Sequence, residues 1–454
     1  MNISMKFNTR KILLIALLSS SYSFSQCFVK IVSGEQHTIA IADNGTLWGW
    51  GSNSSGEAGI SASYPNHVNV PTQIGVATNW TDIECGSYHT LALNSDNELY
   101  TWGFNNSGQL GHGDFTVRTS PTLINGEWKG IGAGSNHSFA ISVDGNLYGT
   151  GQGSGGQLGD NLATSYSVFT TVASGNNWKD ITGGSNFSLA LQNDGTLYAA
   201  GNNGNGQLGK GDLNSSNYWV ATATTITGWD KIDAGLTYSM ALTNNGTLYS
   251  WGYNALGQLG QNGTTQQNAP QPVDINITGF ACGAESSIWK TSTSVFTSGA
   301  NGFYQSQPGT LVDVTTPYEW TTITNHELVT MGIFSSTVVT SSGILTWGRN
   351  DRGICGNGNF TNVTSPTLVS LSCGATTSLE STEIFNGKIY PNPVEDQLNI
   401  QLSEAGTIII TDINGKQLIQ SDRNTLHKIN TSKLASGIYL VQTENGALQK
   451  FVKH

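Results

Sequence analysis

The chain is poor in charge, in proline and in long hydrophobic runs. Charged residues make up 11% of its 454 residues, and there are 10 Pro against 56 Gly, whereas charged residues are about a quarter of an ordinary domain. Few apolar-periodic stretches carry Lys, Glu or Arg on a polar face, which excludes a mostly helical protein. The apolar run Ile12–Leu18 is far shorter than the ~20 residues of a membrane-spanning helix. An all-β chain with glycine turns and no transmembrane helix is predicted.

Basic residues are especially scarce. The whole chain has 19 Lys and Arg against 30 Asp and Glu, and residues 26–376 have nine against 22. Proteins that bind nucleic acid draw affinity from Lys and Arg that neutralise phosphates. Nine scattered cations cannot build such a surface, so a nucleic-acid partner is excluded. No metal-binding or cofactor motif is visible, and no cofactor is predicted.

Residues 1–25 have the layout of a secretory signal peptide. Lys6, Arg10 and Lys11 precede the apolar run Ile12–Leu18, and small residues follow near Ser25. Such a segment is removed on export. We therefore expect a secreted protein whose mature chain begins near Gln26.

One phrase recurs seven times between residues 47 and 356. Its clearest copies read LYTWGFNNSGQLG (99–111) and LYSWGYNALGQLG (248–260), and its poorest is VFTSGANGFYQS (295–306). The copies begin 47 to 52 residues apart, at Leu47, Leu99, Leu147, Leu197, Leu248, Val295 and Ile344. A fixed period of this length indicates a repeat architecture.

Within a copy the pattern is that of short antiparallel strands. Alternating runs such as His89–Leu93 and Leu99–Gly103 are joined by tight-turn pairs, among them Asp144-Gly145 and Asn245-Gly246. Each copy is then a small sheet whose two faces need neighbours. Seven such sheets arranged radially cover one another and form a β-propeller, which we place at residues 26–373.

The phrase G-Q-L-G, the strand L-Y-x-W-G before it and the strand G-x-x-H-(T/S)-x-A together resemble the regulator of chromosome condensation repeat, over roughly 28–373. The resemblance implies a seven-bladed propeller. It also suggests nucleotide exchange on a nuclear GTPase, but no exchange residue can be carried over to this acidic, exported chain. Secreted bacterial propellers of this class that cover β-lactamases with one face are a nearer analogy. Copy six lacks the hairpin turn and most of G-Q-L-G, so a distorted sixth blade is predicted.

The cysteines are interpreted as structural. A closed ring brings its ends together, so Cys27 and Cys373 could form a disulfide in an exported protein, or both could be free, small packed residues. Cys85 and Cys282 occupy one phase of the repeat where other copies have Gly or Ala, and Cys355 replaces a Leu. These three are expected to be packed thiols.

After a linker at 374–385, residues 386–454 form a different domain. Alternating strands predict a small C-terminal β-sandwich. Its motifs resemble the C-terminal sorting domain of type IX secretion cargo in Bacteroidetes, through Tyr390, Pro391, Asn392, Pro393, Asp412, Gly415, Leu434, Gly437, Tyr439 and Lys450. The resemblance implies the type IX machinery as a partner and a secreted or outer-membrane-surface location on a Gram-negative bacterium of the Bacteroidetes type. A plain binding module is the alternative.

Three histidines, His37, His89 and His137, share one phase of the repeat, in which copies four and five have Phe187 and Tyr238. A position that accepts His, Phe or Tyr serves packing or hydrogen bonding within a blade rather than catalysis.

Aromatic residues in the variable loops are the candidate ligand-contact face. They are Tyr64, Phe115, Tyr166, Tyr218, Trp219 and Phe360. Equivalent loops of a ring project from one face, and buried aromatics contribute much of the affinity of protein or sugar sites. The alternative is that they pack between blades.

The leading hypothesis is a secreted, non-enzymatic propeller that binds a protein or a glycan through one face. One alternative is a secreted hydrolase or lyase with its site in the central channel and Asp180, Asp230 or Asp233 as carboxylates. Another is a structural or adhesion component of the cell surface.

Overall fold

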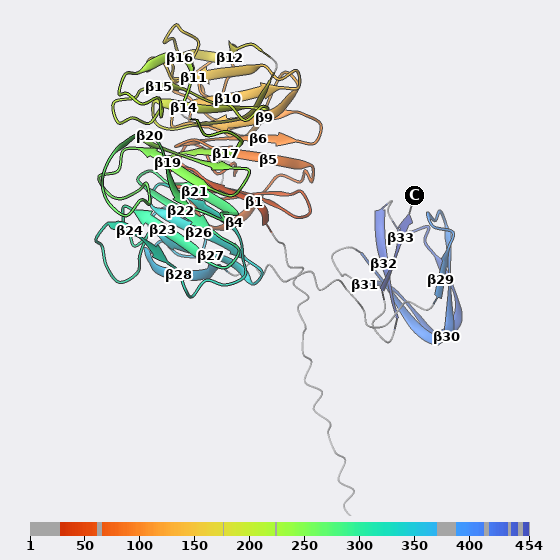
Figure 1. Cartoon of the computed structure of the whole chain (residues 1–454). Helices are drawn as coiled ribbons and strands as arrows, with labels where there is room; N and C mark the ends of the chain where they lie inside the picture. Colours follow the sequence, from red (N-terminus) through yellow and green to blue (C-terminus); the bar gives the residue numbers. More distant parts are fainter. Residues whose placement is uncertain are drawn as a thin grey trace, which may run out of the picture. The chain divides into compact units, whose positions relative to one another are not determined.

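The computed structural model describes residues 28–60, 66–175, 177–222, 225–369, 387–412, 417–434, 437–443 and 448–453. The chain divides into two compact units, Met1–Gly374 and Ala375–His454. All regular structure in the described residues is β-strand (Figure 1), and this part contains no helix of the length and apolarity that a membrane crossing requires. The predicted signal peptide, Cys27, Tyr64, Cys373 and the predicted linker lie outside the described residues.

The first unit consists of seven four-stranded antiparallel sheets, blades 1 to 7, each built from four consecutive strands. The strands of blades 1 to 4 are β1 (Phe28–Ser33), β2 (His37–Ala42), β3 (Leu47–Ser52), β4 (His67–Ile74); β5 (Trp80–Cys85), β6 (His89–Asn94), β7 (Leu99–Gly103), β8 (Arg118–Ile124); β9 (Trp128–Ala133), β10 (His137–Ser142), β11 (Leu147–Gly151), β12 (Tyr166–Ala173); β13 (Trp178–Gly183), β14 (Phe187–Gln192), β15 (Leu197–Gly201), β16 (Ser216–Ala221). The strands of blades 5 to 7 are β17 (Trp229–Ala234), β18 (Tyr238–Thr243), β19 (Leu248–Gly252), β20 (Gln267–Asp274); β21 (Gly279–Cys282), β22 (Ser286–Lys290), β23 (Val295–Gly299), β24 (Val314–Glu319); β25 (His326–Met331), β26 (Ser335–Thr340), β27 (Gly343–Gly348), β28 (Val363–Val369). The predicted seven-bladed propeller is confirmed.

Burial within a blade follows from its place between two neighbours. The second strand is covered on both faces, so β2, β6 and β18 are buried at every position, polar residues included. The fourth strand lies at the rim and is half exposed, as in β8. The hydrophobic core is divided among the interfaces between blades; one cluster joins Phe139 and Leu158 of blade 3 to Trp178 and Ile181 of blade 4.

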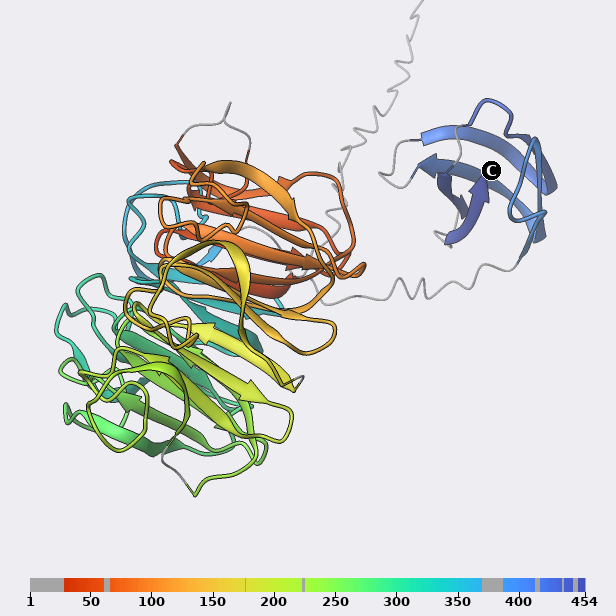
Figure 2. The ribbon, with the colours of Figure 1, turned by 90° about the horizontal axis from the view of Figure 1, so that it is seen from above.

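Within the described residues, the first and last blades close the ring without exchanging a strand. Figures 1 and 2 show blade 1 beside blade 7, and β1 contacts β25 there. The indole of Trp50 in blade 1 donates to the Ile354 carbonyl of blade 7 over 2.8 Å, just as Trp102 of blade 2 donates to Glu57 of blade 1 over 3.0 Å. The joint therefore repeats the contact that links other neighbouring blades.

One glycine per blade makes this close packing possible. A Cβ on Gly134 would lie 2.7 Å from the Gly184 carbonyl oxygen, and one on Gly184 would lie 2.6 Å from that of Gly235. The same close approach is found between all neighbouring blades, and at the last joint a Cβ on Gly332 would lie 3.1 Å from the carbonyl oxygen of Gly34. At Gly134 and Gly184 the added Cβ would lie still closer to a ring of its own blade, 2.1 Å from His137 and 2.0 Å from Phe187 respectively. A larger residue would therefore displace that ring or push adjacent blades apart, which explains why the repeat has glycine at this position.

Blade 6 is regular, so the predicted distortion was wrong. β21–β24 form a complete sheet, and a turn closed by the bond from Thr291 N to Ser294 O replaces the Asn-Gly pair. Neighbouring blades hold the sheet on both sides, so the local turn signal is dispensable. Only the first strand is short, with four residues.

The strand order defines two faces of the ring. Because each blade is a meander, the connections between its first and second strands and between its third and fourth strands emerge at the same end. We call this the turn face. The second-to-third turns and the connections between blades emerge at the other end, the far face.

The second unit is a five-stranded sheet of β29 (Gly387–Tyr390), β30 (Gln397–Asp412), β31 (Gln417–Asn430), β32 (Gly437–Thr443) and β33 (Leu448–Lys453). Its core contains Leu398, Ile400, Val441 and Phe451. It is a small β domain, as predicted.

The predicted sorting motifs contain residues that connect the strands of this sheet and pack in its core. The side chain of Asn392 accepts a hydrogen bond from Val452 N over 2.8 Å, which connects the Tyr390–Pro393 segment to the last strand. Tyr439 is buried and stacks on Phe451, while Asp412 and Gly437 pair with residues of neighbouring strands. Leu434 packs against the core, Lys450 pairs with Leu440 in the sheet, and Gly415 lies outside the described residues.

Candidate functional site

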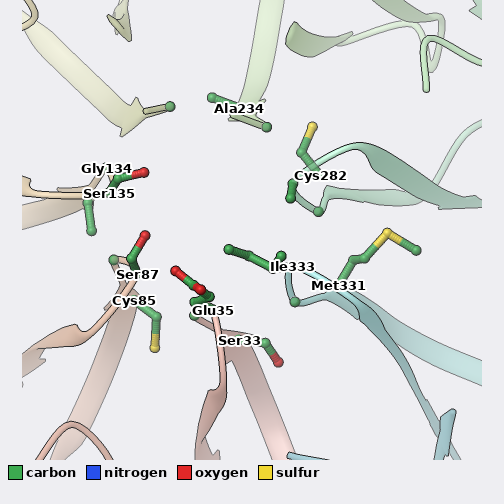
Figure 3. Close-up of a pocket in the computed structure, with 18 of the residues that line it drawn as sticks. Ser33, Glu35, Cys85, Ser87, Gly134, Ser135, Ala234, Cys282, Met331 and Ile333 are labelled. Atoms are coloured by element: carbon green, nitrogen blue, oxygen red, sulfur yellow. The ribbon is translucent and has the colours of Figure 1, made fainter. Parts of the chain in front are cut away.

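The centre of the turn face is a cavity of about 130 Å³ at the mouth of the channel. The ends of the seven innermost strands and the turns that follow them line it. Figure 3 shows Glu35, Ser87, Ser135 and Ile333 around the opening, with Cys85, Cys282 and Met331 on its wall. Small residues dominate because the glycine ring lies at this level.

A lysine and two acids meet inside the channel. The ammonium of Lys30 in blade 1 is paired with Asp82 of blade 2, and with Glu84 of the same blade over 3.1 Å. Burial raises the pKa of Glu84 to about 7, although Lys30 acts in the opposite direction. Burial by itself would lower the pKa of Lys30, but the two carboxylates raise it above its usual value. The lysine therefore stays charged and holds the first two blades together from within.

Two of the three carboxylates predicted as channel candidates do face the channel. Asp180 accepts a hydrogen bond from Ile181 N over 2.9 Å, and Asp233 accepts bonds from Ala234 N and Cys282 N over 2.8 and 2.7 Å. Burial raises the pKa of each to about 6. Asp230 instead forms an exposed pair with Lys179.

These carboxyl groups can hold protons near neutral pH, but their bonds are those of structural groups. Backbone amides and Lys30 are their hydrogen-bond partners. Within the described ranges, none is hydrogen-bonded to a His, Ser or Cys side chain, and no group of three or more His, Cys, Asp or Glu side chains is placed to hold a metal ion.

The three in-phase histidines join neighbouring blades rather than bonding within one, which corrects the prediction. His37, His89 and His137 reach across to Thr90, Ser138 and Ser188 at 3.0, 2.8 and 2.8 Å. Complete burial lowers the pKa of each to about 3, so they remain neutral. Tyr238 takes the same place in blade 5 and donates to the Ser286 carbonyl over 2.6 Å.

The thiols of Cys85, Cys282 and Cys355 are free. Burial raises the pKa of Cys355 to about 12 and that of Cys85 and Cys282 above their usual values. Neutral thiols are poor nucleophiles, which agrees with a packing role.

The aromatic candidates divide into exposed and inward-facing residues. Phe115, Tyr218 and Phe360 are exposed, with 62%, 54% and 48% of their surface accessible. Tyr166 is half-buried and donates to Asp160 over 2.6 Å. Trp219, on β16, is half-buried and packs between blades against Phe139 and Trp178, as in the alternative of packing between blades.

The loops of the turn face that carry Phe115 and Phe360 are held by a buried asparagine. In blade 2, Asn105 donates to the Asp114 and Thr116 carbonyls, both over 3.0 Å, and accepts from Leu110 N. The side chain between the two clamped carbonyls has to project outward, and it is Phe115. Asn203, Asn254, Asn301 and Asn350 make the same clamp in blades 4 to 7.

The clamped position presents Leu213, Thr264, Leu311 and Phe360 in blades 4 to 7, and Leu162 is exposed on the corresponding loop of blade 3. We call Phe115, Leu162, Leu213, Leu311 and Phe360 the apolar tips; each is between 48% and 67% exposed. Three of them are leucines that sequence reasoning missed because it considered only aromatics. The signal was available for Leu213 and Leu311, which lie 12 residues after the glycine that ends the third strand, as Phe115 and Phe360 do; Leu162 lies 11 residues after that glycine.

Three family models together cover most of the chain. Residues 15–289 match the RCC1-like domain, and residues 342–379 match the regulator of chromosome condensation (RCC1) repeat. Residues 388–454 match the secretion system C-terminal sorting domain.

The similar proteins are of diverse function. The chain is 25% identical to human E3 ubiquitin-protein ligase HERC2 over 377 residues, which are 78% of this chain and 6% of HERC2. It is 31% identical to the ultraviolet-B receptor UVR8 of Arabidopsis thaliana over 56% of this chain and 48% of the receptor. Among solved structures, Prp20p of Saccharomyces cerevisiae has a TM-score of 0.63 at 19% identity, covering 80% of this chain and 90% of that one. Human WBSCR16 has a TM-score of 0.62 at 19% identity, covering 72% and 94%.

Proposed function

Because this chain belongs to the RCC1-like domain family and ends in a secretion system sorting domain, it is a secreted or cell-surface propeller, and we propose that it binds an extracellular protein through its turn face without acting as an enzyme. The type IX secretion machinery handles the C-terminal domain. Neither HERC2 nor UVR8 supplies the target, since this chain spans 6% and 48% of their lengths.

The observation that carries the proposal is the set of apolar tips. Single exposed hydrophobic residues are ordinary on protein surfaces. Here, however, all five lie on one face, and four of them, Phe115, Leu213, Leu311 and Phe360, recur at one repeat position on loops clamped by a fully buried asparagine. Association loses less conformational entropy when the contact loops are already rigid. A fixed array of Phe and Leu side chains is suited to a broad protein surface.

Charge indicates the kind of surface that would fit. The propeller is strongly acidic, and three of the cations on turn-face loops are neutralised locally: Arg118 by Asp114, Lys210 by Asp212, and Arg349 by Asp351. The net field therefore favours a partner with basic residues around an apolar patch. Such an association should weaken as salt is added.

The proposal is tested by capture from the bacterial surface fraction with three forms of the full mature chain. The first is wild type, and the second has Phe115→Ser, Leu213→Ser and Phe360→Ser. The third is a control in which exposed apolar residues of the far face are changed, Val76→Ser, Val143→Ser and Ile275→Ser.

A protein held by the wild type and by the far-face control, and lost from the tip variant, is the expected result. Equal retention by all three forms would remove the turn face from consideration. Retention of a polysaccharide in place of a protein would contradict the class of partner.

A further inference from the structure

Around one side of the channel mouth, two repeat positions of the turn face carry no charge. The first is in the turn after the innermost strand, and the second directly follows the third strand. Their backbones bond to each other: Phe104 N to Tyr88 O over 2.8 Å in blade 2, and Gln152 N to Asn136 O over 2.9 Å in blade 3. Asn202 N bonds to Asn186 O over 2.8 Å in blade 4. We call these six residues the uncharged arc.

The arc is continuous across the three blades. The innermost turns are linked by bonds from Ser87 N to Ser135 O and from Ser135 N to Gly184 O, and both serines lie at the opening in Figure 3. On the outer side, the Gln152 amide donates to the Asn186 side chain over 3.3 Å. The Tyr88 and Phe104 rings meet edge to face at 6.4 Å and end the row of amides.

The arc contrasts with the same positions of blades 6 and 7, whereas those of blades 1 and 5 (Gln36, Ser52, Thr237 and Tyr253) are also uncharged. Blades 6 and 7 place Glu285 and Arg349 there, and Arg349 lies over the rings of Phe303 and Phe334. Glu35 of blade 1 also lines the mouth, where its backbone N bonds to Ser87 O, so the arc itself is uncharged but has a carboxylate at its blade 1 end. Five residues of the arc are half-buried and Asn202 is exposed, so all six present groups to solvent.

Two side chains of the arc have polar groups that make no hydrogen bond to the residues that the structure describes. Within the described part of the chain, the Asn136 amide and the Asn202 Nδ2 have no hydrogen-bond partner. An amide offers a donor and an acceptor on one planar group, and so matches a sugar hydroxyl, which both donates and accepts. The half-buried rings of Tyr88 and Phe104 beside the amides add apolar contact for the C–H side of a sugar ring.

We propose that the uncharged arc, with the adjoining cavity of about 130 Å³, is a binding site for a neutral glycan. This site is separate from the apolar tips. It lies beside the channel mouth, whereas the loops that carry the tips extend over the outer strand of the next blade; in blade 2, for example, Gly113 N donates a hydrogen bond to Ser167 O of blade 3. Because a neutral glycan carries no charge, its affinity should not depend on ionic strength, although Glu35, Glu84 and Asp233 line the cavity.

The test is affinity electrophoresis of the full mature chain in native gels that contain a β-1,3-glucan, a galactomannan or dextran, with anionic alginate in a parallel gel. Retardation by at least one neutral polymer is expected, unchanged from about 0.05 to about 0.5 M salt. Retardation by none of them, or by alginate alone, overturns the proposal.

Variants that copy the residue found at the same position of another blade identify the site. Phe104→Ala copies Ala300 of blade 6, and Asn186→Thr copies Thr237 of blade 5, so both should fold. The loss of a stacking ring and of a paired amide should weaken binding about tenfold or more. Glu285→Gln, at the position of Asn186 in blade 6, is the matched control and should bind as the wild type.

Unaltered binding by the double variant, with the wild-type unfolding temperature, would also overturn the site. The apolar-tip variant should keep its polysaccharide binding, and the double variant should keep its protein partner. Failure of one proposal is thereby distinguished from failure of the other.

Discussion

Replacing His137 by Phe should remove a pH dependence from the stability of the ring. His137 is fully buried and bonded to Ser188 across the interface of blades 3 and 4, and Phe187 shows that the ring accommodates a phenyl group at this position. The folded pKa is about 3 against 6.5 for a free side chain. The folded state therefore stays neutral where the unfolded chain takes up a proton.

The sign and size follow from this difference. Because the folded pKa is lowered, the contribution of the neutral histidine is complete above pH 6.5 and is lost as the pH falls towards 3. The loss is about 1.4 kcal/mol per pH unit, or about 2 kcal/mol between pH 6.5 and 5. At pH 7.5 the variant should be less stable by about 1–2 kcal/mol, since Ser188 loses its bond. At pH 5 this deficit should have vanished.

Guanidinium unfolding followed by tryptophan fluorescence at several pH values measures the difference between wild type and variant. Taking the difference cancels the opposite contribution of the buried channel carboxyls. Tyr238→Phe, which removes an interblade hydroxyl at the same repeat position without a titrating group in this range, should give a difference that is constant with pH. A constant difference for His137→Phe as well would refute the reasoning.

Three further predictions concern the ring and its loops. Asp180→Asn should gain stability relative to wild type as the pH rises from about 4 to about 6, by about 1.4 kcal/mol per unit, because the raised pKa near 6 means that ionisation destabilises the folded state; urea midpoints across this range check it. Gly184→Ala should cost about 1–3 kcal/mol through overpacking against Gly235, whereas the exposed Gly204→Ala should change stability by less than about 0.5 kcal/mol, and equal thermal shifts for the two would contradict the role of the glycine ring. Asn203→Ala removes three bonds of the loop clamp and should cost about 3 kcal/mol, with faster proteolysis at 211–215; an unchanged cleavage rate would mean that the loop is rigid without its clamp.

The repeat spacing was sufficient for the architecture. Seven phrases, one glycine per copy and hairpin pairs such as Asp144-Gly145 specify seven sheets that must cover one another, because none can bury its faces alone. Blade 6 shows the limit of local signals. It lacks the turn pair, yet Thr291 and Ser294 close an ordinary hairpin, since neighbouring blades supply the packing that holds it.

The candidate site depended more on contacts between copies. The repeat pattern showed that His37, His89 and His137 occupy equivalent positions in three blades. It did not identify their hydrogen-bond partners, which lie 49 to 53 residues further along the chain. The pairing of Lys30 with Asp82 likewise joins residues 52 apart.

The sequence by itself determined the number of blades, the sorting domain and the acidic, exported character of the chain, because repeat period, motif and charge are properties of the residue order. Only the tertiary structure decided which loop residues face solvent. Trp219 turns inward because Phe139 of the preceding blade offers it a surface. Phe115 points outward because Asn105 fixes the carbonyls on both sides of it. Side-chain direction in a ring of sheets is set by the adjacent blade and by the loop clamp, and neither is written in the local pattern.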